Sequence, residues 1–234
     1  MVLRLRAAGC VFAEDEAALL LAETDDSAEL ERMIKLRVDG LPLEHVLGWA
    51  EFSGRRYAVA PGVFVPRPRT ERLVDLAVAR GGRTVLDLCC GSGAVGAAVA
   101  AALGADLYST ELDSVAVAVA RQNVSRVFEG DLYDALPRGV VFDLIVVVAP
   151  YVPTDEIALL PHEARDFEPS LALDGGADGL DLVRRILAEA AQWLAPSGTL
   201  LTEVSTKQAP LVAEIARGYG LTASISTTVV IVTR

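Results

Sequence analysis

The chain of 234 residues is 52% apolar and 23% charged, which is the composition of a globular protein with a sizeable core rather than of a disordered chain. Its net charge of -11 disfavours binding to a phosphate backbone, because nucleic-acid-binding proteins carry a basic surface that displaces counterions. No apolar run approaches the roughly 20 residues that span a bilayer, and the first ten residues lack the apolar core and cleavage site of a signal peptide. We therefore expect a cytoplasmic protein with a protein or small-molecule partner, no direct nucleic-acid binding and no membrane contact.

Residues 1–47 are predicted to be helical. Asp26 and Glu29 have the spacing of a capping box, and the apolar residues that follow recur with a helical period. Gly40 is expected to end this helix, and Pro42 can begin another.

A hairpin and then an alternation of strands and helices follow. Residues 49–59 form two short stretches around Ser53 and Gly54, which is a hairpin signal. From residue 70 onward the alternation predicts a mainly parallel sheet with helices on both faces. The predicted helices are 70–82, 93–104, 113–124, 179–194 and 207–220, and the predicted strands are 83–89, 105–111, 140–148, 198–204 and one or two within 221–234. The connection 150–178 is long for a compact domain, and such loops tend to be functional or mobile.

The strongest motif is LDLCCGSGAVG, in which Gly91, Gly93 and Gly96 stand as G-x-G-x-x-G between a strand and a helix. Glycines at such a place let the backbone approach a ligand closely at a helix N-terminus. Asp87 precedes the first glycine by four residues, and Glu111 ends the next strand, where a carboxylate can accept hydrogen bonds from ribose hydroxyls. An adenosyl ligand is predicted. A nicotinamide dinucleotide stays open on these features, although D-x-x-x-G-x-G is typical of S-adenosylmethionine binding.

The next predicted strand, FDLIVVVAPY, ends at the carboxyl edge of the sheet, where ligands bind in open parallel sheets. Together with PGVFVPRPRTE, LDLCCGSGAVG, STELD, EPSLALDGGADGLD and LLTEVSTKQ in this order, it resembles the HemK-type (PrmC) protein glutamine N5-methyltransferases. The segments AGCVFAEDEA and GLPLEHVLGWAEF are most similar to an actinobacterial side branch of that family.

The resemblance implies an α/β fold, a class I S-adenosylmethionine-dependent methyltransferase with a Rossmann-like, seven-stranded, mainly parallel sheet. It also implies a helical substrate-recognition domain at 1–47, a β-hairpin linker at 48–69 and a methyltransferase domain at 70–234. The implied substrate is the glutamine in the Gly-Gly-Gln loop of a class-1 peptide chain release factor. The implied cofactor is S-adenosyl-L-methionine, no metal is expected, and the sequence does not indicate an oligomeric state.

Site residues follow from the same resemblance, position by position. It implies that Gly91 and Gly93 pass beneath the methionine part of the cofactor, that Glu111 holds the ribose and that Asp131 lies near the adenine. A segment resembling one wall of the site contains Phe64, Arg67 and Thr70. The residues expected to bind the cofactor are Phe64, Arg67, Thr70, Asp87, Gly91, Gly93, Glu111, Leu112, Asp131 and Leu132. The residues expected at the point of methyl transfer are Val148, Ala149, Pro150 and Tyr151.

Val148 stands where the family has the Asn of an Asn-Pro-Pro-Tyr motif. A carboxamide nitrogen is a poor nucleophile, so the amide must be held in an aligned geometry about 3 Å from the methyl group. In the family the Asn side chain and the following carbonyl are thought to receive the amide hydrogens. Ala149 keeps that carbonyl, and Pro150 and Tyr151 are retained, whereas Val148 has no side-chain acceptor.

Weak or absent glutamine methylation is the expected consequence. A buried N–H without a partner costs roughly 1 to 3 kcal/mol, which is about one to two decades of rate. The alternatives are an S-adenosylmethionine-binding protein with little or no catalysis, or a methyltransferase with an altered acceptor such as a nucleobase amine. The acidic charge and the helical N-terminal part argue against the nucleobase.

Other reactive side chains are given structural interpretations. The resemblance implies a structural role for Glu203 at the sheet edge, and methyl transfer to an amide needs no strong base before attack. His162 has no second His four residues later, so HExxH is absent, and we expect it near the substrate entrance. Cys10, Cys89 and Cys90 lack a metal-binding spacing and are expected to be buried thiols.

Overall fold

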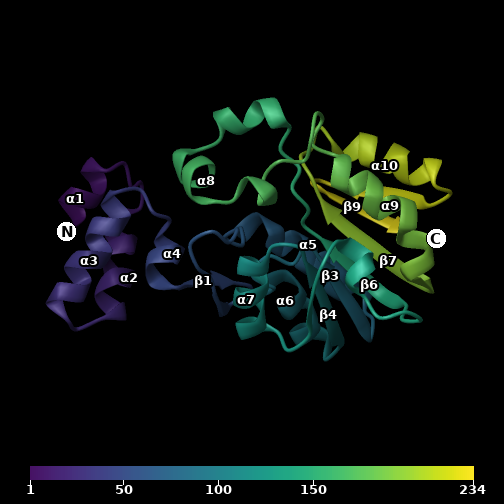
Figure 1. Ribbon diagram of the computed structural model, residues 1–234, viewed down its shortest axis with the longest axis horizontal. Helices are drawn as coiled ribbons and strands as arrows, with labels where there is room; N and C mark the ends of the chain where they lie inside the picture. The colour runs from purple at the N-terminus through teal and green to yellow at the C-terminus, as the bar shows by residue number, and fades with distance from the viewer.

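A small helical bundle forms the start of the chain in the computed structural model, which describes residues 1–234. Its core is separate from those of the sheet and includes Leu5, Leu20 and Ile34, all buried. Figure 1 shows the bundle at one end of the molecule, beside the sheet rather than on either face. Its helices are α1 Val2–Ala7, α2 Ala13–Glu23, α3 Ser27–Val38 and α4 Leu43–Leu47.

The start of α3 forms one half of the expected capping box. The Asp26 carboxylate accepts the N–H of Ala28 at 2.9 Å, which satisfies a donor that the first turn would otherwise leave free. Glu29 does not reach back to complete the box, because it pairs with Arg32 at 2.6 Å. The Asp26 N–H instead donates to the Thr24 hydroxyl at 3.1 Å.

The predicted hairpin joins the bundle to the sheet. Its strands are β1 Trp49–Phe52 and β2 Arg55–Ala58, which pair antiparallel. Ser53 and Gly54 both have positive φ, at 49° and 70°, as a two-residue turn that matches the strand twist requires.

Seven strands form one sheet in the order β5-β4-β3-β6-β7-β9-β8. The strands from β5 to β7 are parallel, and β9 runs antiparallel to both β7 and β8. The mainly parallel seven-stranded fold is thereby confirmed, and the C-terminal tail forms two paired strands. The strands are β3 Thr84–Leu88, β4 Asp106–Glu111, β5 Val127–Glu129, β6 Phe142–Val147, β7 Leu194–Glu203, β8 Thr222–Ser226 and β9 Val229–Thr233. The prediction missed β5, because three residues are too few to show a period.

Helices cover both faces of the sheet. The covering helices are α5 Glu71–Arg80, α6 Ala94–Leu103, α7 Ser114–Asn123, α9 Asp181–Trp193 and α10 Ala209–Gly218. Ile145 and Val147 of β6 pack in one core with α9 and α10, and Leu144 and Val146 pack in the other with α5 and α6. Alternate side chains of a strand point to opposite faces, so a strand buried on both faces reads as a continuous apolar run.

The connection between β6 and α9 is built of short helices and contacts the bundle. Figure 1 shows it above the space between the bundle and the sheet. Arg37 of α3 is bonded to Glu163 of this connection at 2.7 Å and to Glu16 of α2 at 2.6 Å. The short helices are Thr154–Leu159, α8 His162–Phe167 and Ser170–Ala172. No helix of the chain has the length and apolar character needed to cross a bilayer.

Candidate functional site

A cavity of about 550 Å³ opens at the carboxyl edge of the sheet. Most of its wall comes from four parts of the chain, namely the segment after the hairpin, the loop after β3, the ends of β4 and β5, and the connection after β6. A volume of this size is typical of a small-molecule site. Its position is the one where open parallel sheets bind their ligands.

The cavity brings together thirteen of the fourteen residues predicted for the site. Its lining includes Phe64, Arg67, Thr70, Asp87, Gly91, Glu111, Leu112, Asp131, Leu132, Val148, Ala149, Pro150 and Tyr151. Gly93 is outside the lining and has a φ of 79° at the N-cap of α6. A Cβ on Gly93 would approach the Val124 side chain to 3.2 Å, so backbone conformation and close packing account for this glycine.

The loop after β3 turns its backbone toward the cavity. Cys89 and Gly91 have φ values of 55° and 54°, in the left-handed region that favours glycine. No atom lies within 4 Å of where a Cβ on Gly91 would stand, so this residue faces open space. A non-glycine residue in that region is uncommon and clusters at ligand sites, and Cys89 lies on the cavity wall.

Asp87 lies beneath this loop with 1% of its surface exposed. Its carboxylate accepts the N–H of Gly96 at 2.8 Å. Burial raises the pKa of Asp87 to about 7 against that hydrogen bond, and repulsion from Glu111 adds to the rise. A carboxyl with such a pKa is partly protonated at neutral pH.

Glu111, at the end of β4, accepts three backbone N–H groups. They come from Gly91 at 2.8 Å, Leu112 at 2.7 Å and Asp113 at 3.0 Å. A carboxylate offers about four lone-pair positions, so one remains for a ligand hydroxyl. The Glu111 carboxylate therefore ties the glycine loop to β4 and still has capacity to bind a ribose.

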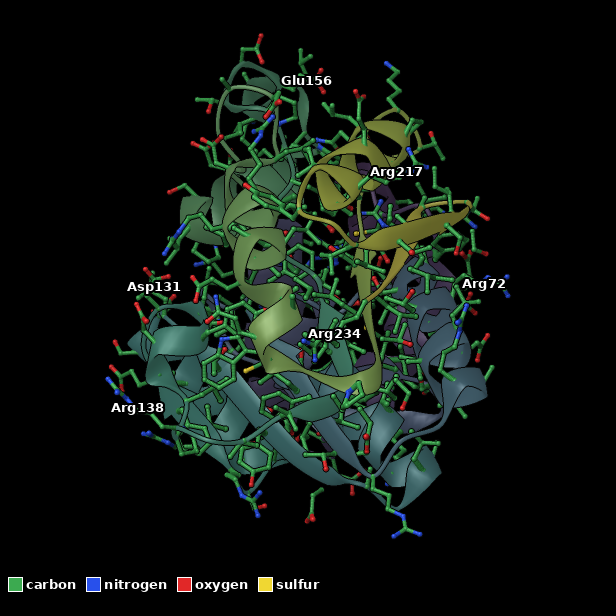
Figure 2. The ribbon with its side chains drawn as sticks, turned by 90° about the vertical axis from the view of Figure 1, so that its right-hand side faces the viewer. Arg72, Asp131, Arg138, Glu156, Arg217 and Arg234 are labelled. Carbon is green, nitrogen blue, oxygen red and sulfur yellow. The ribbon has the colours of Figure 1, made fainter.

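Apolar side chains flank Glu111 on the cavity wall. Leu112 lines the cavity and exposes 52% of its surface, which leaves apolar surface that suits contact with a flat ring. Leu132 is buried with a φ of 47°. Asp131, at the edge of the view in Figure 2, pairs with Arg185 at 2.7 Å.

The segment before α5 is tied to the connection after β6. Arg67 donates to Glu168 at 2.6 Å, and the second oxygen of Glu168 accepts the Val65 N–H at 3.1 Å. The Arg67 guanidinium also lies 4.8 Å from the centre of the Phe64 ring. Burial raises the pKa of the Glu168 carboxyl, and Arg67 opposes that rise. The sequence did not indicate Glu168 as a site residue, because it lies in an acidic run of the kind that usually forms a solvated surface, although it stands in one of the quoted family segments.

The end of β6 forms the other wall. Ala149 is buried, and the Tyr151 carbonyl accepts a hydrogen bond from Gln208 at 2.8 Å. The Tyr151 hydroxyl contacts Arg69 and lies 3.5 Å from Glu203 at the end of β7. Burial raises the pKa of Tyr151, so its hydroxyl stays protonated. The Val148 side chain, on the same wall, has no hydrogen-bonding group.

The remaining reactive side chains form no second site. Cys10 and Cys90 are buried, and Cys89 is half-buried. Burial raises the pKa of both Cys89 and Cys90, so both remain thiols. His162 pairs with Asp166 at 3.0 Å on α8 and is not part of the cavity lining. No group of His, Cys, Asp and Glu side chains could hold a metal ion.

Comparison with known sequences finds a coherent set of relatives. Residues 85–167 match the family model described as "Methyltransferase domain". The release factor glutamine methyltransferase of Gloeobacter violaceus is 40% identical over 76% of this chain and 66% of its own length. Proteins with the same name from Geobacter sulfurreducens and Bordetella pertussis are 38% and 37% identical, over 80% and 90% of this chain and 69% and 84% of their own lengths.

Solved structures share the fold at lower identity. A methyltransferase from Pyrococcus furiosus has a TM-score of 0.57 at 20% identity, covering 76% of this chain and 87% of its own. A T. thermophilus 16S rRNA methyltransferase, solved in complex with AdoMet and guanosine, has a TM-score of 0.56 at 22% identity, covering 80% of this chain and 49% of its own. Both are similar in fold alone.

Proposed function

The chain belongs to the release factor glutamine methyltransferase family and is an S-adenosylmethionine-dependent methyltransferase, and on that premise we propose that its acceptor is a glutamine amide in the Gly-Gly-Gln loop of a class-1 peptide chain release factor. The observation that carries this proposal is one cavity that joins the glycine loop and Glu111 to the segment from Val148 to Tyr151. A cofactor wall and an acceptor wall must share one cavity for direct transfer.

The residues of the cofactor wall, which are the glycine loop, Glu111 and Leu112, fit an adenosyl cofactor. Gly91 faces open space, so its backbone can lie against the methionine part without a side chain between them. Glu111 has one lone-pair position left for a ribose hydroxyl, and the exposed Leu112 offers apolar surface to the adenine. When bound, S-adenosylmethionine supplies a methyl group on a sulfonium centre that needs only an aligned nucleophile.

The residues of the acceptor wall, from Val148 to Tyr151, offer a hydrogen-bond acceptor to only one of the two N–H groups of the amide. The Ala149 carbonyl can accept one amide N–H, and the Tyr151 ring limits the slot. Val148 offers no second acceptor, so one N–H loses its partner when the amide is desolvated, at about 1 to 3 kcal/mol. We therefore expect glutamine methylation that is about one to two decades slower than with Asn at this position.

The bundle and the connection after β6 are proposed to recognise the protein substrate. Glu163 lines the cavity and is bonded to Arg37 of the bundle, so the bundle is linked to the cavity wall. Leu3, Val11 and Phe12 expose 81%, 82% and 69% of their surfaces on the bundle, and exposed apolar surface favours protein contact.

One experiment tests the proposal in two steps. Calorimetry first measures binding of S-adenosylmethionine, and labelled methyl transfer to a release factor is then measured, with a factor carrying Ala in place of the acceptor glutamine as the control. We expect binding, and slow transfer that the control abolishes. Binding with no transfer to the factor or to any protein of a cell extract would support a non-catalytic role, which Val148 favours. Transfer to another acceptor would support an altered substrate, and absence of binding would overturn the assignment of the cavity.

A further inference from the structure

Arg69 links the segment before α5 to the ends of β6 and β7, at the end of the cavity where the acceptor is proposed to bind. It belongs to a short 3-10 helix, Pro68–Thr70, just before α5. Its Nε atom donates to the Glu203 Oε1 atom at 3.2 Å, and its Nη2 atom donates to the Tyr151 hydroxyl. The Glu203 side chain is 2% exposed, whereas the Arg69 side chain is 62% exposed and lines the cavity.

The Arg69 guanidinium has unused donors. A guanidinium carries five N–H groups in a rigid planar fork. Two of them are bonded, one to Glu203 and one to Tyr151, and no other partner of Arg69 is present. Three N–H groups therefore remain on a fork whose position is set by a buried carboxylate. Such a fork suits a carbonyl or carboxylate oxygen.

The strand register places this fork beside the point of methyl transfer. Val147 of β6 pairs with Thr202 of β7, so the next residues along, Val148 and Glu203, are neighbours at the edge of the sheet. The contact of Arg69 with Tyr151 puts it on the same wall. The acceptor stretch itself is poor in donors, because the Val148 side chain is apolar and Pro150 has no N–H.

We propose that Arg69 is a substrate-binding residue that donates to the carbonyl oxygen of the acceptor side chain, with Glu203 and Tyr151 as positioning residues for the guanidinium. This deepens the proposed function and rests on it, since the acceptor is taken to be a glutamine amide. An acceptor held by its oxygen turns its nitrogen away from Arg69, toward the Ala149 carbonyl. Arg69 thus supplies part of the orientation that Val148 does not.

The variants that test Arg69 must not unfold the chain. Glu203 is buried and its Oε2 atom has no hydrogen-bond partner. Removal of Arg69 alone would also take the counter-charge from its Oε1 atom, and this can unfold the chain. Two variants avoid that outcome. R69K keeps the cation and removes the fork, and the double variant R69A/E203Q removes both charges.

Arg72 provides a matched control. It is an exposed arginine one residue into α5, bonded to Ser226 at 3.1 Å, and it is not part of the cavity lining. Figure 2 shows it at the edge of the view opposite Asp131.

The test is calorimetric binding of a release factor to each variant in the presence of S-adenosylhomocysteine, with the acceptor as glutamine and as glutamate. A hydrogen bond to a charged oxygen is stronger than one to a neutral oxygen. We expect R69K and R69A/E203Q to weaken binding of the glutamine form about tenfold and of the glutamate form at least about 30-fold, with R72A within about twofold for both.

Two results overturn the proposal and can be told apart. An equal loss for the glutamine and glutamate forms, or no loss, shows that Arg69 only supports the wall, and it leaves the proposed function standing. Failure of the unmodified chain to bind the release factor, while it still binds the cofactor, overturns the proposed function and the role of Arg69 with it.

Discussion

The Gly96 N–H donates to the Asp87 carboxylate at 2.8 Å, and this hydrogen bond joins the first turn of α6 to β3 beneath the glycine loop. Asp87 is fully buried and its pKa is raised to about 7. At a pH below its ordinary pKa the carboxyl is neutral in both the folded and the unfolded chain, so its burial does not lower the free energy of unfolding. As the pH rises from about 4 to about 7, the unfolded chain ionises more readily than the folded one, and stability is lost.

The variant D87N should remove that loss, because Asn is neutral and its oxygen can still accept the Gly96 N–H. We expect D87N to gain about 3 kcal/mol in free energy of unfolding at pH 8 relative to its effect at pH 4.5. Denaturant unfolding at the two pH values, without cofactor, measures the gain. D75N, on the exposed side of α5, is the control, and the same pH dependence in both variants would contradict the assignment to Asp87.

G96A should destabilise the chain by overpacking. A Cβ at this position would stand 2.6 Å from the Cβ of Asp87 and 2.9 Å from Leu107, so α6 must shift away from the sheet. We expect a loss of about 1 to 3 kcal/mol in the free energy of unfolding. The control is G218A at the end of α10, where a Cβ would meet nothing within 4 Å. Equal stability of the two variants would rule out close packing as the reason for Gly96.

V148N should raise the rate of methyl transfer to the release factor about 10- to 100-fold, because the Asn carbonyl accepts the N–H that Val148 leaves unpaired. Cofactor affinity should stay within about twofold, since position 148 belongs to the acceptor wall. V148A is the control, because it opens the same space without adding an acceptor. The prediction fails if V148A gains as much rate as V148N, or if the unmodified chain already transfers at the rate of V148N.

E111Q should weaken cofactor binding by at least about tenfold in calorimetry. One carboxylate oxygen of Glu111 accepts the Gly91 N–H, and the other accepts those of Leu112 and Asp113. Glutamine has one acceptor oxygen, so at least one of these donors loses its partner and the loop changes shape. E129Q alters an exposed glutamate of β5 that is the register partner of Glu111, and it should leave the affinity for the cofactor unchanged. A loss of affinity in both variants would indicate a general charge effect instead.

R37M should destabilise the chain more than E163Q, although both break the link between the bundle and the connection after β6. The side chains of Arg37 and Glu16 are 8% and 11% exposed, and that of Glu163 is 49% exposed. Removing Arg37 leaves Glu16 as an uncompensated buried charge, at about 3 to 5 kcal/mol, whereas a half-exposed pair contributes about 1 kcal/mol or less. Thermal and denaturant unfolding of both variants measure the difference. Similar losses of stability in R37M and E163Q would show that the pair of Arg37 with Glu163, rather than its buried pair with Glu16, is the stabilising contact.

Local patterns in the sequence were sufficient to predict most elements of the sheet domain. The continuous apolar run of β6 and the helical period of α9 each reflect contacts within one element, so they can be read without knowing its neighbours. Strand β5 was missed because it is only three residues long. The capping box at Asp26 was half right, because the side-chain pair of Glu29 and Arg32 replaced the reciprocal bond.

The candidate site was predicted less completely, because its walls are far apart in the chain. The glycine loop was recognised from local spacing, yet Gly93 faces Val124 rather than the cavity. Glu168 and Arg69 were not predicted as site residues, since their partners, Arg67 and Glu203, lie 101 and 134 residues away. No periodicity or motif in one segment can indicate such a pair.

The sequence by itself determined the order of most strands and helices, the glycine turn after β3 and the apolar Val148, because each depends on residues that are neighbours in the chain. The tertiary structure alone decided that the Arg69 guanidinium is anchored on Glu203 and that Arg37 joins the bundle to Glu163. These contacts exist because the layers of the fold bring distant carboxylates and guanidinium groups together, where burial makes an unpaired charge costly and pairing necessary.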